Sequence, residues 1–295
     1  MICALALALP ACGDDGAAGD GDGTTDASTS GADDGTTPPS TSMSPDSGST
    51  TAPEGTTDGG STDDGGSTDG GSTDGGSTDD GTSTGVGPTV TVSGIITDFG
   101  SDMVLENIDV CVFEIDSIPC ATSDAKGAYS LTGVPVTEGA IEFTGPNRFP
   151  SLFWGAGPME DVTLNYNLLS NLAATVLAVA LDEEIDPLLG HLAVAVADDK
   201  GVLVSGVTFT MTPDSGAIGY LDTDGIDPML TETSEVGFAG FVNVDVGEVE
   251  IVASHPTLDC VPGPGALVGA TPDALRIDVR AAYLGSTFPF ICSAP

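Results

Sequence analysis

Few residues in this chain of 295 have the types and the spacing that enzyme chemistry needs. His191 and His255 are the only histidines, and neither has a neighbouring cysteine or a Gly-x-Ser-x-Gly motif to supply a nucleophile. Asp and Glu together number 45, so carboxylate pairs at a glycosidase-like spacing are expected by chance. We therefore predict no enzyme activity, no catalytic residues and no cofactor, with both histidines at incidental surface or edge positions.

An acidic segment near the middle of the second half has some likeness to a calcium loop. Asp222, Asp224 and Asp227 are closely spaced, and Glu232 follows. In the Asp-x-Asp-x-Asp-Gly loop the glycine stands sixth, whereas Gly225 here stands fourth. We interpret the segment as a solvated hairpin tip that binds no metal, with calcium as the weaker alternative.

Cys12 stands where a lipid would be attached. An apolar run over residues 2–9 leads into Leu-Pro-Ala-Cys at 9–12, and Gly-Asp-Asp follows. This arrangement resembles the lipobox of bacterial lipoproteins, which implies that 1–11 is a removed signal segment and that lipidated Cys12 anchors the protein to a membrane. Signal peptides begin with basic residues, but the first basic residue of this chain is Lys126. We therefore expect that the start codon has been placed too late. A cytosolic N-terminus with an ordinary thiol is the alternative.

Four further cysteines fit an exported protein. An even number of cysteines outside the cytoplasm predicts disulfides, and three pairings are possible. Closeness in sequence favours Cys111–Cys120 and Cys260–Cys292. A zinc site is the competing interpretation, but the chain has no short Cys-x-x-Cys pair.

Residues 12–87 have the composition of a disordered acidic tether. The segment holds 16 carboxylates, no Lys or Arg and no aromatic residue, and Gly-Gly-Ser-Thr-Asp occurs in it four times. Such a segment buries too little apolar surface to offset its chain entropy. A Gly/Ser-rich coil of this length spans ~45–50 Å. We expect it to hold a folded part away from a surface, and calcium bound to its Asp clusters would be diffuse.

Net charge excludes two classes of partner. The formal charge is −40, with 45 acidic and 5 basic residues. Nucleic-acid binding needs a basic surface, as does peripheral attachment to anionic lipids. The protein is therefore expected to bind no nucleic acid and to reach a membrane only through its anchor.

Residues 88–295 alternate between apolar and polar types with turn residues every 8–12 positions. This period of two is typical of antiparallel β-sandwiches, in which one sheet face is buried and the other is wet. The apolar positions that we expect in the core include Val90, Val92, Ile108, Val110, Val112, Tyr129, Leu131, Ile141, Phe143, Val162, Leu164, Tyr166, Val207, Phe209, Met211, Val249, Ile251, Ile277 and Val279.

An internal repeat divides this part of the chain. Residues 92–98, 107–112 and 122–129 have counterparts at 192–198, 206–210 and 233–238, about 100–110 positions later, which is the size of one sandwich domain. In both copies a strand ends at an Asp turn, and a Thr-Ser-acid turn that ends in glycine opens a hairpin.

This pattern over 89–145, and more weakly over 191–255, resembles the carboxypeptidase regulatory-like domain. The resemblance implies a transthyretin-like sandwich that has no catalytic residues. The whole layout resembles surface lipoproteins of myxobacteria. The fold class is accordingly all-β, with two tandem sandwiches at 88–168 and 190–295 and a linker with one short helix at 169–189.

The linker is expected to contain that helix. Ser170 can cap a helix over 171–181, in which Leu172, Val176 and Val179 follow helical spacing. Carboxylates at 182–184 predict a stop near Leu181. Because the segment is apolar nearly all round, we expect it to be buried between the two sandwiches.

The segment 148–155 gathers the only tryptophan with two phenylalanines. Phe149, Phe153 and Trp154 would form a platform for a sugar if they were exposed. A cluster of this kind more often covers the end of a sandwich, and we expect burial. The resulting hypothesis is a non-enzymatic, lipid-anchored protein of the outer membrane or cell surface with an adhesive, scaffolding or envelope role. The alternative is a carbohydrate-binding module that uses 148–155, and envelope components or glycans are the expected partners.

Overall fold

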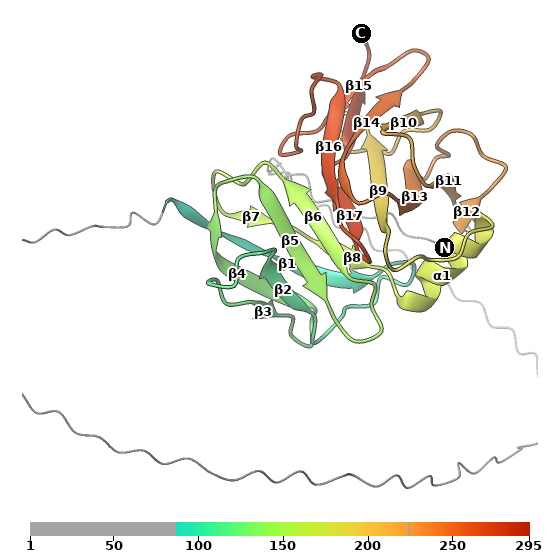
Figure 1. Ribbon diagram of the computed structural model, residues 1–295. Helices are drawn as coiled ribbons and strands as arrows, with labels where there is room; N and C mark the ends of the chain where they lie inside the picture. Colours follow the sequence, from blue (N-terminus) through green and yellow to red (C-terminus); the bar gives the residue numbers. More distant parts are fainter. Residues whose placement is uncertain (1–86, 224) are drawn as a thin grey trace, which may run out of the picture. The chain divides into compact units, whose positions relative to one another are not determined.

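The structure is a computed structural model that describes residues 87–223 and 225–295 (Figure 1). The predicted signal segment 1–11, the lipidation site Cys12 and nearly all of the predicted tether 12–87 lie outside the described residues. Within the two described ranges, no helix combines the length and the apolar composition that crossing a bilayer requires.

The described residues form an all-β fold, as the alternation predicted. The strands of the first half are β1 (Thr89–Asp98), β2 (Asp109–Val112), β3 (Ala121–Thr122), β4 (Ala128–Pro135), β5 (Gly139–Thr144), β6 (Ser151–Gly155), β7 (Val162–Thr163) and β8 (Tyr166–Leu168). The helix α1 (Asn171–Ala180) follows them. The strands of the second half are β9 (Gly190–Ala197), β10 (Thr208–Thr212), β11 (Ala217–Asp222), β12 (Gly225–Asp227), β13 (Phe238–Val244), β14 (Gly247–Ser254), β15 (Asp259–Pro262), β16 (Ala274–Val279), β17 (Leu284–Thr287) and β18 (Phe290–Ser293).

The first half is a sandwich around one hydrophobic core. Strand β1 pairs with β4, β7 and β8, and the facing strands run in the order β6-β5-β2-β3. Alternating residues of both layers meet in the core, where Val110 and Phe143 are fully buried. Phe143 also stacks on Tyr166 with 4.3 Å between the ring centroids. The period-two pattern placed these side chains correctly, because successive residues of a strand point to opposite faces.

The second half repeats this design. Strands β10, β14 and β16 form one layer, and β9, β13, β11 and β12 belong to the other. The apolar residues predicted on β10, β14 and β16 are buried in the core between them, namely Phe209, Met211, Val249, Ile251, Ile277 and Val279.

Strand β17 joins the two halves. It pairs in parallel with β6 on one edge and with β9 on the other, so that one sheet runs β12-β11-β13-β9-β17-β6-β5-β2-β3. This sheet crosses the boundary predicted between 88–168 and 190–295. The side chains of β6 serve both cores, because Phe153 packs in the first and its neighbours Leu152 and Trp154 pack in the second. Alternation along a single strand does not reveal such sharing.

The internal repeat is present in the hydrogen bonds of the structure. In the first copy, the buried hydroxyl of Ser123 accepts a hydrogen bond from the Ile108 N–H at 2.9 Å. The same hydroxyl donates to the Leu105 carbonyl at 2.8 Å. It thereby satisfies two backbone groups that would otherwise be short of a partner.

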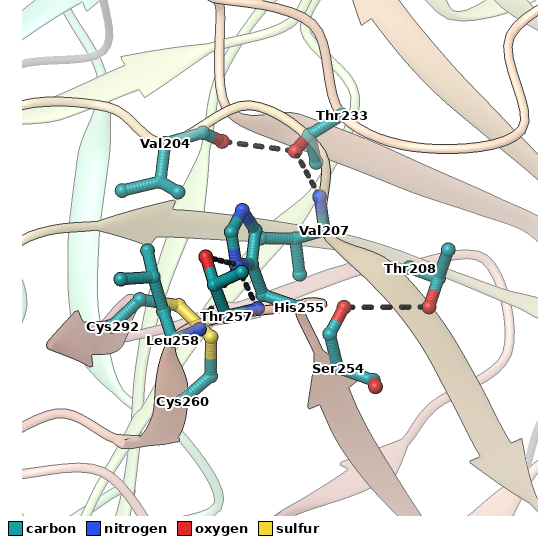
Figure 2. Close-up of a disulfide and its surroundings, with 10 residues drawn as sticks. All are labelled: Val204, Val207, Thr208, Thr233, Ser254, His255, Thr257, Leu258, Cys260 and Cys292. Carbon is teal, nitrogen blue, oxygen red and sulfur yellow. Dashed lines mark hydrogen bonds between the residues drawn. A yellow bond between two sulfur atoms is a disulfide. The ribbon is translucent and has the colours of Figure 1, made fainter. Parts of the chain in front are cut away.

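Thr233 has the same role in the second copy. Its hydroxyl accepts from the Val207 N–H at 3.0 Å and donates to the Val204 carbonyl at 2.9 Å (Figure 2). Ser123 therefore corresponds to Thr233, one residue earlier than an alignment of the two Thr-Ser pairs would place it. The predicted repeat is confirmed with this shift.

Helix α1 begins and ends where the sequence predicted, but its apolar stripe lies elsewhere. The Ser170 side chain accepts from the Ala173 N–H at 3.1 Å, and the helix stops before Leu181. The prediction that the helix is buried between the two sandwiches was wrong, because only Ala174 and Ala178 of its residues are buried. The helix contacts the rest of the protein along this small-residue face. The predicted stripe is exposed and consists of Leu172, Val176 and Val179.

Candidate functional site

The three aromatic residues of the segment 148–155 are buried. Phe149, Phe153 and Trp154 are between 5% and 8% exposed, and the last two lie on β6 rather than in a loop. A ring stacks on a sugar only if its face reaches solvent. The structure therefore contradicts the carbohydrate platform and agrees with the expected burial. The physical reason is that β6 lies inside the shared sheet and has a core on each face.

A cavity of about 110 Å³ lies where α1 covers the sheet. Helix α1 contributes Ala174, Leu177 and Ala178 to its lining. The sheet contributes residues of β9, β11, β12, β13 and β17, among them Leu192, Leu221, Ile226, Phe241 and Leu284. No Lys, Arg, Asp or Glu of the described residues lines this space. We call it the α1 cavity.

His191 on β9 is the titratable group in the lining whose ring is short of a partner. Its side chain is 6% exposed, and the edge of Phe149 meets it with 5.3 Å between ring centroids. The Nδ1 atom accepts a hydrogen bond from the Asn243 N–H at 3.3 Å. The ring proton must then lie on Nε2, which is buried and has no hydrogen-bond partner among the described residues. The expectation of an incidental surface or edge histidine was wrong for His191.

The other polar groups of the lining already have partners. The Tyr166 hydroxyl and the Ser286 hydroxyl are 2.8 Å apart and share a hydrogen bond. Burial raises the pKa of the Tyr166 phenol, so the group stays neutral. Asn167 accepts a hydrogen bond from the Thr97 hydroxyl. Among the buried polar side chains of the lining, His191 is thus the one with spare hydrogen-bonding capacity.

Burial of His191 predicts a pH-dependent stability. Desolvation lowers the pKa of His191 below its ordinary value of 6.5. As the pH falls through about 6.5, the unfolded chain takes up a proton that the folded protein refuses, so stability falls. The free energy of unfolding then falls by up to about 1.4 kcal/mol per pH unit. His191→Asn, which keeps an acceptor near the Nδ1 position, should show a shallower slope between pH 7 and 5 in urea titrations.

A comparison at higher pH controls for the many carboxylates. Above about pH 7.5 both states of His191 are neutral, so the wild type and His191→Asn should change in parallel. Identical slopes of the two proteins below pH 7 would contradict the buried, neutral histidine.

The other candidates from the sequence do not come together in a site. His255 lies in a turn, where its Nδ1 accepts from the N–H groups of Thr257 and Leu258 at 3.1 Å each (Figure 2). Asp222 and Asp227 accept hydrogen bonds from backbone N–H groups one and two residues on. Asp224 lies outside the described residues. Within the described part, no cluster of three His, Cys, Asp or Glu side chains is arranged to hold a metal ion.

Both predicted disulfides are present. Cys111 is bonded to Cys120 next to the β2–β3 hairpin, and Cys260 is bonded to Cys292 across the paired strands β15 and β18. The second bridge lies in the core of the second half, where both of its cysteines are buried (Figure 2).

Comparison with known proteins identifies no family. No family model matches the sequence, and no curated protein matches it. Among solved structures, the chain is similar to a type II cohesin–X–dockerin complex of Acetivibrio cellulolyticus, at 18% identity over 27% of this chain and 56% of that chain, with a TM-score of 0.23. The TIE protein of Bacillus anthracis is 11% identical over 69% of this chain and 34% of that chain, with a TM-score of 0.22. The minor pilin of Streptococcus agalactiae is 11% identical over 70% of this chain and 97% of that chain, with a TM-score of 0.23.

The chain therefore spans about half the length of the first of these structures and a third of the second. At TM-scores this low, the likenesses support no conclusion about function.

The α1 cavity was not predicted from the sequence. The available signal was His191 itself. It is the second residue of β9, Gly-His-Leu-Ala-Val-Ala-Val-Ala, and the residues that follow it in this strand are all apolar. A run of this kind is typical of a strand buried on both faces. A histidine within it is expected to be buried as well.

Proposed function

We propose that the chain is a non-enzymatic, lipid-anchored protein of the bacterial cell surface with an adhesive, scaffolding or envelope role. The observation that carries the proposal is the pair of disulfides, Cys111–Cys120 and Cys260–Cys292. Disulfides persist in oxidising compartments and are rare in the cytosol. A chain with two of them works outside the cytoplasm, where the lipobox-like segment around Cys12 also directs it.

The organisation of the chain supports a role as a displayed module. In the proposal, Cys12 holds the protein at the membrane, and the acidic segment 12–87 spaces the folded part from the surface. The two halves resemble the carboxypeptidase regulatory-like domain, an accessory fold without catalytic residues. Strand β17 joins these halves in one sheet, so that a force applied to one half, for example by a bound partner, is transmitted to the other. Envelope components are the proposed partners.

Lipidation of Cys12 tests the anchor directly. The full chain, expressed with a basic segment placed upstream, is expected to incorporate a lipid analogue in metabolic labelling. Cys12→Ser should incorporate none, because the thiol that carries the lipid is gone.

A second cysteine variant gives the matched control. Cys3 lies within the segment 1–11 that the proposal removes, so Cys3→Ser should be labelled like the wild type. Equal labelling of the wild type and Cys12→Ser would overturn the anchor. Protection of the labelled protein from external protease on intact cells would overturn display at the surface.

A further inference from the structure

Helix α1 presents a row of large apolar side chains to solvent. Leu172, Val176 and Val179 are 76%, 59% and 65% exposed, and their spacing of four and three residues places them on one face of the helix over two turns. Single exposed apolar residues are common on protein surfaces, whereas adjoining ones mark surfaces that another molecule covers. We call these three residues the α1 stripe.

Carboxylates gather at the end of the helix where the α1 stripe finishes. Four of the five residues in the 182–186 segment are Asp or Glu, and the Asp182 N–H donates to the Val179 carbonyl at 3.0 Å. The last turn of α1 contains no basic residue. None of the ion pairs among the described residues involves the 182–186 segment. Carboxylates are unfavourable beside the negative end of a helix dipole, so this arrangement lowers the stability of the helix.

Asn243 on β13 holds the 182–186 segment in place. Its side-chain nitrogen donates to Glu183 Oε2 and to the Glu184 carbonyl, each at 2.9 Å. Its Oδ1 accepts from the Asp186 N–H at 3.0 Å. The backbone of the segment is therefore fixed beside the end of the α1 stripe, and its carboxylates need little ordering when a partner binds.

The charge of the folded part decides which partner fits this surface. Residues 88–295 hold 29 acidic and 5 basic side chains. Three of the basic ones, Arg148, Arg276 and Arg280, are already paired with carboxylates. A second copy of the chain or an anionic bilayer would bring like charge against the surface. A helix with apolar residues on one face and basic side chains beside them complements both the stripe and the carboxylates.

We propose that the α1 stripe and the 182–186 segment form a docking surface for a cationic amphipathic helix of a partner protein. The apolar face of that helix packs on the stripe, and its Lys or Arg side chains lie against the carboxylates. The surface gives the displayed module a class of partner, and it rests on the proposed function only for the compartment. Labelling of Cys12 tests that part separately, so that either proposal can fail alone.

A 14-residue peptide that repeats Leu-Lys-Lys-Leu-Leu-Lys-Leu tests the surface on the full chain. It is expected to shift the methyl resonances of Leu172, Val176 and Val179. A peptide with Glu in place of every Lys should shift none of them, and neither should one of the same composition in an order without an apolar face. Because these methyl groups lie on α1, binding of the peptide to the carboxylates of 12–87 is not mistaken for docking.

Four outcomes of this titration would overturn the proposal. The Lys peptide could leave all three methyl groups unshifted, or the Glu peptide could shift them equally. Shifts on dilution of the protein without peptide would identify a second copy of the chain as the occupant. Shifts on addition of phosphatidylglycerol vesicles without peptide would identify a bilayer.

Asp182→Asn/Glu184→Gln separates docking from folding. Asparagine suits the positive φ of 59° at position 182, and Asn243 binds the backbone carbonyl of Glu184, which the change retains. The variant should be at least as stable as the wild type, because two carboxylates leave the negative end of the helix. It should bind the Lys peptide about fivefold more weakly at low salt.

The matched control for charge lies in the predicted tether. Asp79→Asn/Asp80→Asn changes the net charge by the same amount, and it should shift the methyl groups of the α1 stripe with the affinity of the wild type. Equal affinities of Asp182→Asn/Glu184→Gln and this control would refute the role of the carboxylates.

Val176→Ser tests the apolar part of the surface. The change removes the middle of the α1 stripe and should weaken the Lys peptide at least tenfold, read from Leu172 and Val179. Stability should change little, because Val176 is largely exposed. The matched control is Val202→Ser, which is 61% exposed between β9 and β10 and should bind like the wild type. Unchanged binding by folded Val176→Ser would refute docking on the stripe.

Discussion

Trp154→Ala is expected to lower the free energy of unfolding by about 3–5 kcal/mol without removing any glycan binding. The side chain is 8% exposed and packs in the core of the second half. The edge of Phe113 meets it with 6.1 Å between ring centroids and planes at 74°. Alanine would leave a large void between β6 and the second core. Urea denaturation followed by circular dichroism, together with a glycan binding screen, measures both effects, because the substitution removes the single tryptophan and its fluorescence.

Trp154→Phe is the matched control. Phenylalanine keeps most of the buried apolar area and removes the indole N–H, which is buried without a partner among the described residues. The loss of buried apolar area lowers the stability of the variant, whereas the removal of an unsatisfied donor raises it. The expected cost is therefore well below that of the alanine variant. A Trp154→Ala protein that kept its stability but lost glycan binding would restore the carbohydrate-binding alternative.

Removal of the Cys260–Cys292 bridge is expected to cost about 3.7 kcal/mol by the loop-entropy relation. The two cysteines are 32 residues apart and lie in the core of the second half, at 7% and 1% exposure. The double variant Cys260→Ala/Cys292→Ala removes the bridge without leaving a thiol to mispair. Urea unfolding curves of this variant and the wild type give the difference in stability.

The first disulfide provides a comparison within the same chain. Cys111 and Cys120 are 9 residues apart, and Cys120 is exposed, so the double alanine variant there should lose about 2.5–3 kcal/mol. A larger loss of stability on removal of this bridge than on removal of Cys260–Cys292 would contradict the expected dependence on loop length. Non-reducing peptide mapping should recover the same two pairs, and crossed peptides would contradict the pairing itself.

Local patterns predicted the β fold and the two disulfides, because both features depend on residues that are close in sequence. A strand alternates its side chains whatever it pairs with, so Val110 and Phe143 could be assigned to a core from the pattern alone. The Ser170 cap acts within one turn of the helix that it starts. Each disulfide closes between cysteines near each other in the chain.

Positions that depend on distant parts of the chain could not be predicted in this way. The spacing of Leu172, Val176 and Val179 identified one side of α1 correctly, but periodicity does not say which side meets the sheet. The structure shows that the alanine face meets it. Ala174 and Ala178 lie on the covered side together with Leu177, and Leu172, Val176 and Val179 remain exposed.

By itself, the sequence predicted the all-β class, the core positions of the alternating segments, the repeat, the limits of α1 and the acidic character of the protein, and it favoured both disulfide pairs. The tertiary structure alone decided that β17 inserts between β6 and β9 and joins the two halves into one sheet. These positions depend on pairing between residues more than 90 apart in the chain. Alternation is identical in parallel and antiparallel pairs and in edge and central strands, so no local pattern carries that information.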